Sequence, residues 1–416
     1  MTAESEHESR VRAAIKTALT TVPFYAKQGL AARVDGSNGV APDAPLNELL
    51  RHLPLLTRDK VRPTLPKQWF PEGRDAKAEL ASGSVSVIEV GLGASRVRAL
   101  FDPRWYTTQQ KRALGIDASS RDAVLWVPER GTGSCGAGDP GYEERLEGTR
   151  LHVNSRQDPT FWTEPVMTRM LDELTQHETT ALLADPFYLD VLARHAAILG
   201  RRLDVRDFIG LMRARPTLAQ RAQLARVYLG KVLDVFAARE VGTLFVTGDD
   251  GLMHHASFAT HVEMLPAKVP TPGAEKVALL AVTTLDRQVQ PLVRYVLGDL
   301  VQVASPSAIT TVEGTLDDCI VRPDGALVTP GAIDRAVGAE PRAYQVTQSA
   351  PDAVELEVIG GNVGDIEARL VPLFHGLKVS SRAVTAIGVE PNGKYRTSRR
   401  TNVPFAIEAA FEGAVP

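Results

Sequence analysis

The stretch RYVLGDL, residues 294–300, lies about three quarters of the way along a chain of 416 residues. It follows an apolar run, and its Gly298–Asp299 pair predicts a tight turn at the end of a strand. A carboxylate placed at a strand end can accept hydrogen bonds from the hydroxyl groups of a ribose. We therefore take Asp299, with the neighbouring Arg294, as candidate nucleotide-binding residues.

The segments before this stretch predict a mixed α/β region. GTLFVT (242–247) and KVALLAVTTL (276–285) have the β-branched, apolar composition of strands. PVMTRMLDELTQH (165–177) and FYLDVLARHAAIL (187–199) instead repeat apolar residues at the spacing of a helix. Strands mixed with helices predict an α/β core of about 300 residues.

The composition changes after this region. ASPSAITTVEGTLDD (304–318) is rich in small and polar residues, as is typical of a linker between domains. The roughly 100 residues beyond it alternate short strands and helices, and 416 residues exceed what one core usually supports. We therefore expect a large N-terminal α/β domain, residues 1–312, and a small α+β C-terminal lid domain, residues 317–416, hinged near Asp317.

Charge and cysteine content exclude several classes of protein. The net charge is −3 and no sustained Lys/Arg cluster occurs, so we expect no binding of nucleic acid. The two cysteines, Cys135 and Cys319, are too few for a disulfide scaffold or a zinc site. The N-terminus has no apolar signal region and no run of 18 apolar residues occurs. These features predict a cytoplasmic protein without membrane contact and without a metal site.

Several short motifs occur in the order known from one enzyme family. They are LPLLTRDKVRP (53–63), ASGSVSV (81–87), VFAARE (235–240), RYVLGD (294–299), GTLDD (314–318) and NGKYR (392–396). Taken together, the chain resembles the adenylate-forming superfamily, and within it the phenylacetate-CoA ligase-like branch. The likeness extends over nearly the whole chain and implies that fold.

The resemblance also implies a chemistry. In that family the large domain binds ATP and an acyl or aryl acid, and the small domain rotates between two half-reactions. The first makes an acyl-adenylate, and the second transfers the acyl group to the thiol of CoA or of a carrier-protein phosphopantetheine. By resemblance, Phe236 stacks on an adenine or aryl ring, Glu240 coordinates Mg²⁺ and Asp299 with Arg294 contacts the ribose. Lys394, in the lid, stabilises charge at the acid carboxylate.

The sequence departs from the family at the phosphate-binding segment. Such segments use Gly-rich backbone, hydroxyl groups and a Lys, whereas only Ser82, Gly83 and Ser84 remain here and Glu89 adds negative charge. Two like charges ~4 Å apart repel by ~1 to ~4 kcal/mol. Thr315 also replaces the Arg of the hinge motif. We therefore do not expect ATP to be used, and Lys394 could instead hold a phosphate of CoA.

The thiol of Cys135 is a candidate nucleophile. By resemblance, TGSCGA (132–137) lies on the loop that lines the bound acid near its carboxylate. Its small neighbours would let a thioester approach, and a thiolate can hold an acyl group in transit. A base or cation must activate it, and His254 and Lys394 are candidates. The alternative is that Cys135 is an inert small residue in a glycine-rich loop.

Three functions remain open. The first is transfer of an aryl group, such as anthraniloyl or benzoyl, from its CoA thioester to an acyl carrier protein, without ATP. This pattern resembles the anthraniloyl transferases of aurachin biosynthesis, a secondary-metabolite pathway that needs a polyketide starter unit. The second is an ATP-dependent aryl-CoA ligase with a divergent phosphate-binding segment. The third is a non-catalytic relative that binds a carrier protein. Proteins of this branch are often dimeric, so the resemblance also makes a homodimer compatible with the sequence.

Overall fold

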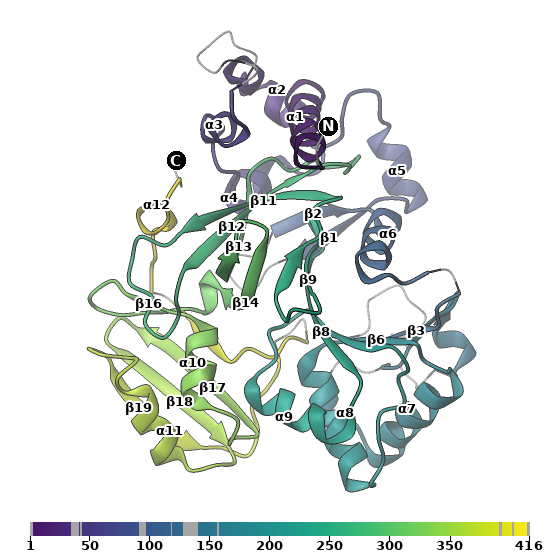
Figure 1. Cartoon of the computed structure of the whole chain (residues 1–416), viewed down its shortest axis with the longest axis vertical. Coiled ribbons are helices and arrows are strands. Elements are labelled where there is room, and N and C mark those ends of the chain that lie inside the picture. The colour runs from purple at the N-terminus through teal and green to yellow at the C-terminus, as the bar shows by residue number, and fades with distance from the viewer. Residues whose placement is uncertain are drawn as a thin grey trace.

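The predicted architecture, a large α/β domain followed by a smaller α+β domain, is confirmed by the computed structural model (Figure 1). The model describes residues 3–34, 41, 44–90, 97–117, 119–127, 140–155, 158–390, 393–401 and 403–413. A twelve-stranded sheet runs through the large domain, and a four-stranded sheet forms the small one. The strand order of the large sheet is β11-β12-β13-β14-β10-β9-β8-β7-β6-β3-β5-β4.

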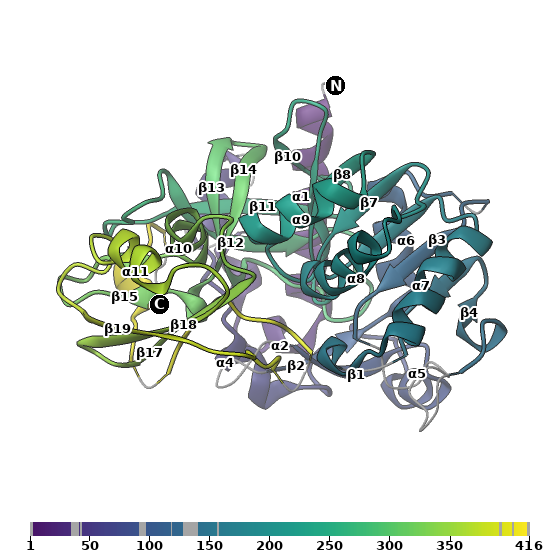
Figure 2. The same ribbon diagram turned by 90° about the horizontal axis from the view of Figure 1, so that it is seen from below.

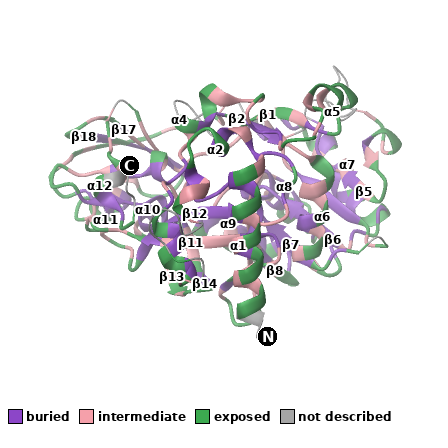
Figure 3. Ribbon diagram, turned by 90° about the horizontal axis from the view of Figure 1, so that it is seen from above, coloured by how far each residue is buried: buried purple, intermediate pink, exposed green. Residues whose placement is uncertain are grey.

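The N-terminal region covers one face of the large sheet with helices. Helix α1 (Ala3–Thr21) ends before Pro23 and buries Val11, Ile15 and Leu19, while its outer side stays exposed (Figure 3). It is followed by α2 (Pro23–Ala26), α3 (Leu46–Arg51), α4 (Arg58–Val61), α5 (Ala76–Ser82), strands β1 (Ser86–Val90) and β2 (Val97–Phe101), and α6 (Pro103–Leu114). Among the described residues, none of the helices is both long and apolar enough to cross a membrane.

One half of the large sheet is mainly parallel and carries helices between its strands. Its elements are β3 (Asp122–Leu125), β4 (Leu146–Glu147), β5 (Arg150–His152), α7 (Glu164–Gln176), β6 (Ala181–Ala184), α8 (Pro186–Ile198), β7 (Phe208–Leu211), α9 (Leu218–Val227) and β8 (Lys231–Ala238). Strands β3, β6, β7 and β8 are parallel neighbours. The carboxyl ends of parallel strands meet at one edge of a sheet, where ligands commonly bind.

The other half of the large sheet is antiparallel. It contains β9 (Gly242–Thr247), β10 (Met253–His255), β11 (Thr260–Pro266), β12 (Val277–Thr284), β13 (Tyr295–Ser305) and β14 (Ala308–Thr315). Most of the segment expected to be a linker, 304–318, is therefore strand β14, and that prediction was wrong. Its Ile309 is fully buried in the large core and β14 pairs with both β13 and β10, so β-branched packing outweighs the small, polar composition.

The small domain has a hydrophobic core of its own. It consists of η7 (Leu316–Asp318), β15 (Ile320–Val321), β16 (Leu327–Val328), α10 (Pro330–Val337), β17 (Ala343–Ala350), β18 (Ala353–Ile359), α11 (Val363–Leu370), β19 (Lys378–Ala383) and β20 (Ser398–Arg400). Tyr344, Leu356 and Phe374 lie in one buried cluster formed mainly by residues 320–374. We therefore propose that this unit begins near residue 317.

The end of the chain returns to the large domain. After α12 (Ile407–Ala410), Phe411 is completely buried in a cluster with Leu265 and Leu279 of the large sheet. Figure 1 shows α12 beside the large domain, apart from the small sheet. We propose that the small domain ends near residue 401, and that the residues beyond it form a C-terminal strap.

Candidate active site

A short segment of the small domain enters the large one. Residues 393–395, which we call the lid segment, reach toward the middle of the molecule from the small domain (Figures 1 and 2). Gly393 adopts φ +77°, and a Cβ added there would lie 2.7 Å from the Tyr188 hydroxyl and 2.8 Å from Val127 Cβ. The Tyr395 ring stacks on Phe187 with centroids 4.7 Å apart. Only glycine therefore fits at this contact between the domains.

The lid segment brings Lys394 into a group of buried and half-buried charges. Six residues form what we call the interdomain cluster: Arg58, Asp185, Arg213, Glu240, Asp299 and Lys394. Burial lowers the pKa of Lys394, and Arg213 lowers it further, while Asp299 and Asp185 oppose the change. The ammonium group therefore gives up its proton more readily than that of an ordinary lysine.

The carboxyl group of Asp299 lies on β13 at the large-domain side of this cluster. Burial raises its pKa to about 7, although Arg58 and Lys394 favour the charged form. The protonated form of the group is therefore accessible near neutral pH, so it can donate as well as accept hydrogen bonds. The structure thus brings together Asp299 and Lys394, two residues that the sequence predicted separately.

Glu240 has a cationic neighbour rather than a set of metal ligands. The Arg58 Nη2 lies 3.6 Å from the buried Glu240 Oε1, and the Arg58 guanidinium also bonds to Tyr295. Mg²⁺ prefers an octahedral set of oxygen ligands. In the described ranges, no group of three His, Cys, Asp or Glu side chains could hold a metal ion. A single carboxylate can still hold Mg²⁺ together with substrate phosphates, so Glu240 as a Mg²⁺ ligand stays a prediction.

Arg294 and Phe236 lie in packed surroundings. The Arg294 guanidinium, 2% exposed, donates to Glu263 at 2.9 Å and to the Leu53 carbonyl oxygen. Phe236 is partly buried, and its ring stacks on Phe245 with centroids 6.4 Å apart. For Arg294 to bind a cofactor it would have to release these internal partners, so we leave it out of the cluster.

The pairing of the predicted nucleophile with its proposed base is not tested, because the nucleophile lies outside the described residues. Cys135 lies within residues 128–139, outside the part of the chain that the structure describes. His254, on β10, is 49% exposed and lies 2.9 Å from Asp250. Cys319 is buried, its Sγ lies 3.4 Å from the Thr315 carbonyl oxygen, and burial raises the pKa of its thiol well above the usual value. The role of Cys135 stays a prediction.

The expected phosphate-binding segment is the end of a helix. Ser82 is the last residue of α5, and Gly83 caps the helix with φ +74°. The hydroxyl groups of Ser82 and Ser84 both donate to the Glu79 carbonyl oxygen, at 3.0 and 3.1 Å. Glu89 is exposed on β1 opposite Arg98. The two hydroxyl groups thus already serve the helix end, and the assignment of this segment to the family's phosphate loop stays a prediction.

The sequence between β1 and β2 is a second segment with phosphate-binding composition. It comprises residues 91–96, GLGASR, and lies outside the described residues. Two glycines, a serine and an arginine are residue types that bind phosphate. The loss of a phosphate site therefore does not follow from Ser82–Ser84.

Three members of the cluster were not predicted. Arg58 lies in LPLLTRDKVRP (53–63), a motif that served only to identify the resemblance to the adenylate-forming superfamily. Asp185 and Arg213 each follow an apolar strand, in ALLAD (181–185) and FIGLMR (208–213). An ionisable residue directly after a buried parallel strand is the signal that could have found them.

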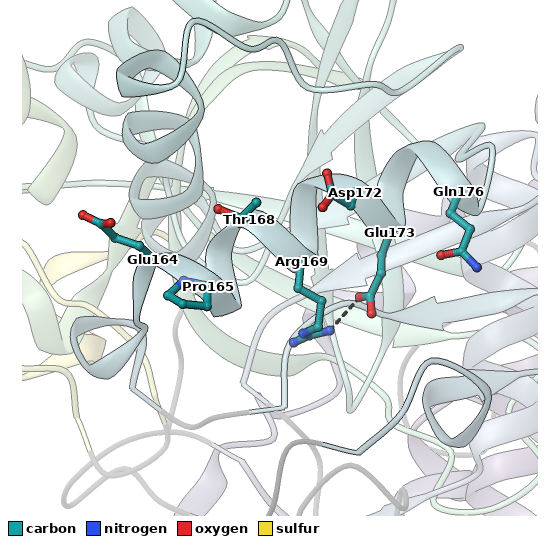
Figure 4. A pocket seen from close by; sticks show the side chains of 7 residues that line it. All are labelled: Glu164, Pro165, Thr168, Arg169, Asp172, Glu173 and Gln176. Atoms are coloured by element: carbon teal, nitrogen blue, oxygen red, sulfur yellow. Dashed lines mark hydrogen bonds and ion pairs between the residues drawn. The ribbon is translucent and has the colours of Figure 1, made fainter.

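A separate depression of 590 Å³ lies along α7 (Figure 4). Its described lining residues all come from this helix, and Arg169 and Glu173 form an ion pair there at 2.6 Å. None of the predicted site residues that the structure describes lines it. We therefore place the candidate active site at the interdomain cluster.

Comparison with known proteins identifies the fold class. The chain matches no protein-family model and no curated protein sequence. Among solved structures it is similar to a 2-hydroxyisobutyryl-CoA ligase in the postadenylation state with 2-HIB-AMP. The TM-score is 0.67 at 16% identity, over 97% of this chain and 91% of that chain. The chain therefore has the fold of adenylate-forming ligases, as its motifs predicted.

Two further structures resemble part of the chain. ATP-bound MatB from Rhodopseudomonas palustris gives a TM-score of 0.53 at 12% identity, over 75% of this chain and 66% of that chain. The anthranilate CoA ligase AuaEII with anthranoyl-AMP gives 0.51 at 12% identity, over 76% of this chain and 65% of that chain. For the 2-hydroxyisobutyryl-CoA ligase in its thioesterification state the TM-score is 0.53. The whole-chain arrangement is thus closer to the postadenylation state.

Proposed function

We propose that the protein is an acyltransferase that moves an aryl or acyl group from its CoA thioester to the phosphopantetheine thiol of an acyl carrier protein. The observation that carries this proposal is the Arg58–Glu240 pair, at 3.6 Å, beside the retained Asp299 and Lys394. Mg²⁺ bound at Glu240 would face a guanidinium across a few ångströms, and like charges repel strongly in a poorly solvated site. The Arg58–Glu240 pair thus disfavours the first half-reaction, which forms the acyl-adenylate from ATP with Mg²⁺.

The retained residues Asp299 and Lys394 suit the second half-reaction, in which the acyl group is transferred to a thiol. Asp299 can bond to the ribose of CoA, and Lys394, whose pKa burial lowers, can accept a proton from a thiol. Exchange of one thioester for another is nearly isoenergetic, so it needs no ATP. The proposal therefore uses the adenosine-binding side of the fold for CoA.

The reaction balances without a further reactant. The incoming thiol gives its proton to the neutral form of Lys394, and its sulfur forms a bond to the thioester carbonyl carbon. The bond from that carbon to the CoA sulfur then breaks, and the CoA thiolate takes the proton from Lys394. In the covalent form of the proposal, Cys135 is the first acceptor and the carrier thiol the second.

The test is a transfer assay with intact-protein mass measurement. With benzoyl- or anthraniloyl-CoA and a holo carrier protein, we expect the carrier to gain one acyl group without ATP. Lys394→Ala should slow transfer by about 10²-fold or more, as expected for loss of a proton-transfer group. A Cys135→Ala protein that transfers at the wild-type rate would support direct transfer. Acylation that strictly requires ATP would contradict the proposal.

A second candidate is an ATP-dependent aryl-CoA ligase. It is favoured by the greater likeness to a postadenylation structure, with TM-scores of 0.67 against 0.53 for the thioesterification state of the same enzyme. ATP–pyrophosphate exchange with a panel of benzoates distinguishes the two. Exchange that depends on the acid would establish the ligase, and carrier binding without either activity would indicate a non-catalytic relative.

A further inference from the structure

Helix α10 of the small domain contacts the large domain through a buried carboxylate. The Asp334 side chain accepts from Arg215 Nη1 at 2.8 Å and from the Leu218 backbone amide at 3.1 Å. Both partners belong to the large domain, and Leu218 is the first residue of α9. The same carboxylate accepts from the Tyr344 hydroxyl of the small domain at 3.0 Å. Asp334 therefore ties the small domain to the start of a large-domain helix.

A second buried carboxylate makes the reverse contact. Glu313 lies on β14 of the large domain, and it accepts from Arg335 of α10 at 2.7 and 3.0 Å. The Thr329 hydroxyl, at the start of α10, donates to Glu313 as well. Asp334 and Glu313 are both 0% exposed. Each domain thus contributes one buried carboxylate, and the cation that pairs with it belongs to the other domain.

The backbones are closely packed at these contacts. A Cβ added at Gly331 of α10 would lie 2.4 Å from Glu313 Oε2. A Cβ added at Gly314 of β14 would lie 2.4 Å from Pro330 Cγ. One glycine from each domain therefore lets α10 approach the large sheet.

These contacts define one orientation of the small domain. The rotation between half-reactions that the resemblance implies would separate Asp334 from Arg215 and Glu313 from Arg335 at the same time. A buried charge that loses its partner is strongly destabilised unless water replaces the partner. The rotation would therefore have to open the whole contact of α10 with the large domain.

We propose that the ion pairs Asp334–Arg215 and Glu313–Arg335 form a latch that holds the small domain in a single orientation, so that the chain works without the domain rotation of adenylate-forming ligases. This inference goes beyond the proposed function, because a protein of either candidate activity could carry such a latch. The small domain is then a fixed wall of the site and not a moving lid.

The test is a distance measurement between two spin labels, one in each domain. The labels are attached through non-natural amino acids at Gln176 of α7 and Lys378 of β19, which are both exposed, so that no cysteine is modified. With the latch intact, we expect one narrow distance distribution, unchanged by CoA, by benzoyl-CoA or by benzoate with Mg²⁺–ATP. A second distribution, or a shift with any of these ligands, would overturn the inference.

Removal of the latch cations should release the small domain. The double variant Arg215→Ala, Arg335→Ala leaves both carboxylates buried without a cation. We expect its distance distribution to gain a second, broader component of about 10% or more. Arg215→Ala alone, which leaves every small-domain residue in place, should give a smaller component at the same distances.

The matched control is Arg194→Ala. Arg194 also pairs at 2.8 Å with a buried carboxylate, Asp190, but both residues lie on α8 within the large domain. We expect the distribution of the intact latch from this control. The inference is overturned if the latch variants keep that distribution, or if the control gains the same second component. No acyl transfer is measured, so the result does not depend on the proposed function.

Discussion

At the scale of single residues, the lid segment depends on a glycine with no space beside it. In Gly393→Ala, the new methyl group would lie 2.7 Å from the Tyr188 hydroxyl, at φ +77°. We expect Lys394 to be displaced, with a loss of transfer activity of about 10-fold or more, because small misplacements of reacting groups are costly. The melting temperature should change little, since the core of the small domain lies elsewhere. Wild-type activity in this variant would show that Lys394 does not need this position.

The carboxyl group of Asp299 makes stability depend on pH. Its pKa is raised to about 7 in the folded protein, against about 3.9 when unfolded. The folded state therefore binds more protons between these values, and its stability falls as pH rises from about 4 to 7. In Asp299→Asn, the decrease in the free energy of unfolding between pH 4 and 7 should be smaller by up to roughly 4 kcal/mol. The measurement is the unfolding free energy of the wild-type protein and of Asp299→Asn at several pH values. A difference between the two proteins that does not change with pH would contradict this prediction.

Residues within a recognisable motif were easier to predict than residues brought together by the fold. Asp299 and Lys394 belong to RYVLGD and NGKYR, and each could be singled out from its local sequence. Arg58 and Arg213 belong to the site because of residues far away in the chain: Glu240 for Arg58 and Lys394 for Arg213. A single sequence does not reveal such pairs, although the buried strand before Arg213 marks that residue as lying near a strand end.

At the scale of helices and strands, local composition was a poor guide where helix capping or strand pairing determines the structure. Asp75 caps the start of α5 by accepting from the Lys77 and Ala78 amides, each at 3.0 Å, and Gly83 at φ +74° ends the helix after Ser82. The small residues of 82–84 therefore end a helix, although they resemble a phosphate loop. The predicted strands GTLFVT and KVALLAVTTL were confirmed, because their apolar runs are long and buried.

The helix end can be tested directly. Ser82→Ala and Ser84→Ala each remove one hydroxyl bond to the Glu79 carbonyl oxygen. Both residues are exposed, so each change should cost less than about 1 kcal/mol of stability. We also expect activity and nucleotide affinity within about twofold of wild type, since neither hydroxyl is free for a phosphate. A large loss of nucleotide binding would restore the phosphate-loop interpretation.

At the scale of the whole molecule, the small domain is attached at both of its ends. At its beginning, Arg335 of α10 pairs with Glu313 of β14 at 2.7 Å, and Asp334 of α10 pairs with Arg215 of the large domain at 2.8 Å. At its end, the strap bonds to the large domain from Lys268 N to the Ala410 oxygen, at 2.8 Å. A rotation of the small domain must therefore break these contacts or be limited by them. A transferase that performs one reaction would need no large rotation.

The strap provides the corresponding test. Phe411 is fully buried against Leu265 and Leu279, so Phe411→Ala should cost about 3–5 kcal/mol of strap attachment. We expect faster hydrogen exchange at the hinge, residues 316–318, and in the lid segment, together with slower acyl transfer. Phe411→Leu, which retains most of the buried surface, is the matched control and should remain close to wild type. Unchanged exchange at both places in Phe411→Ala would mean that the interdomain contacts around Lys394 hold the small domain without the strap.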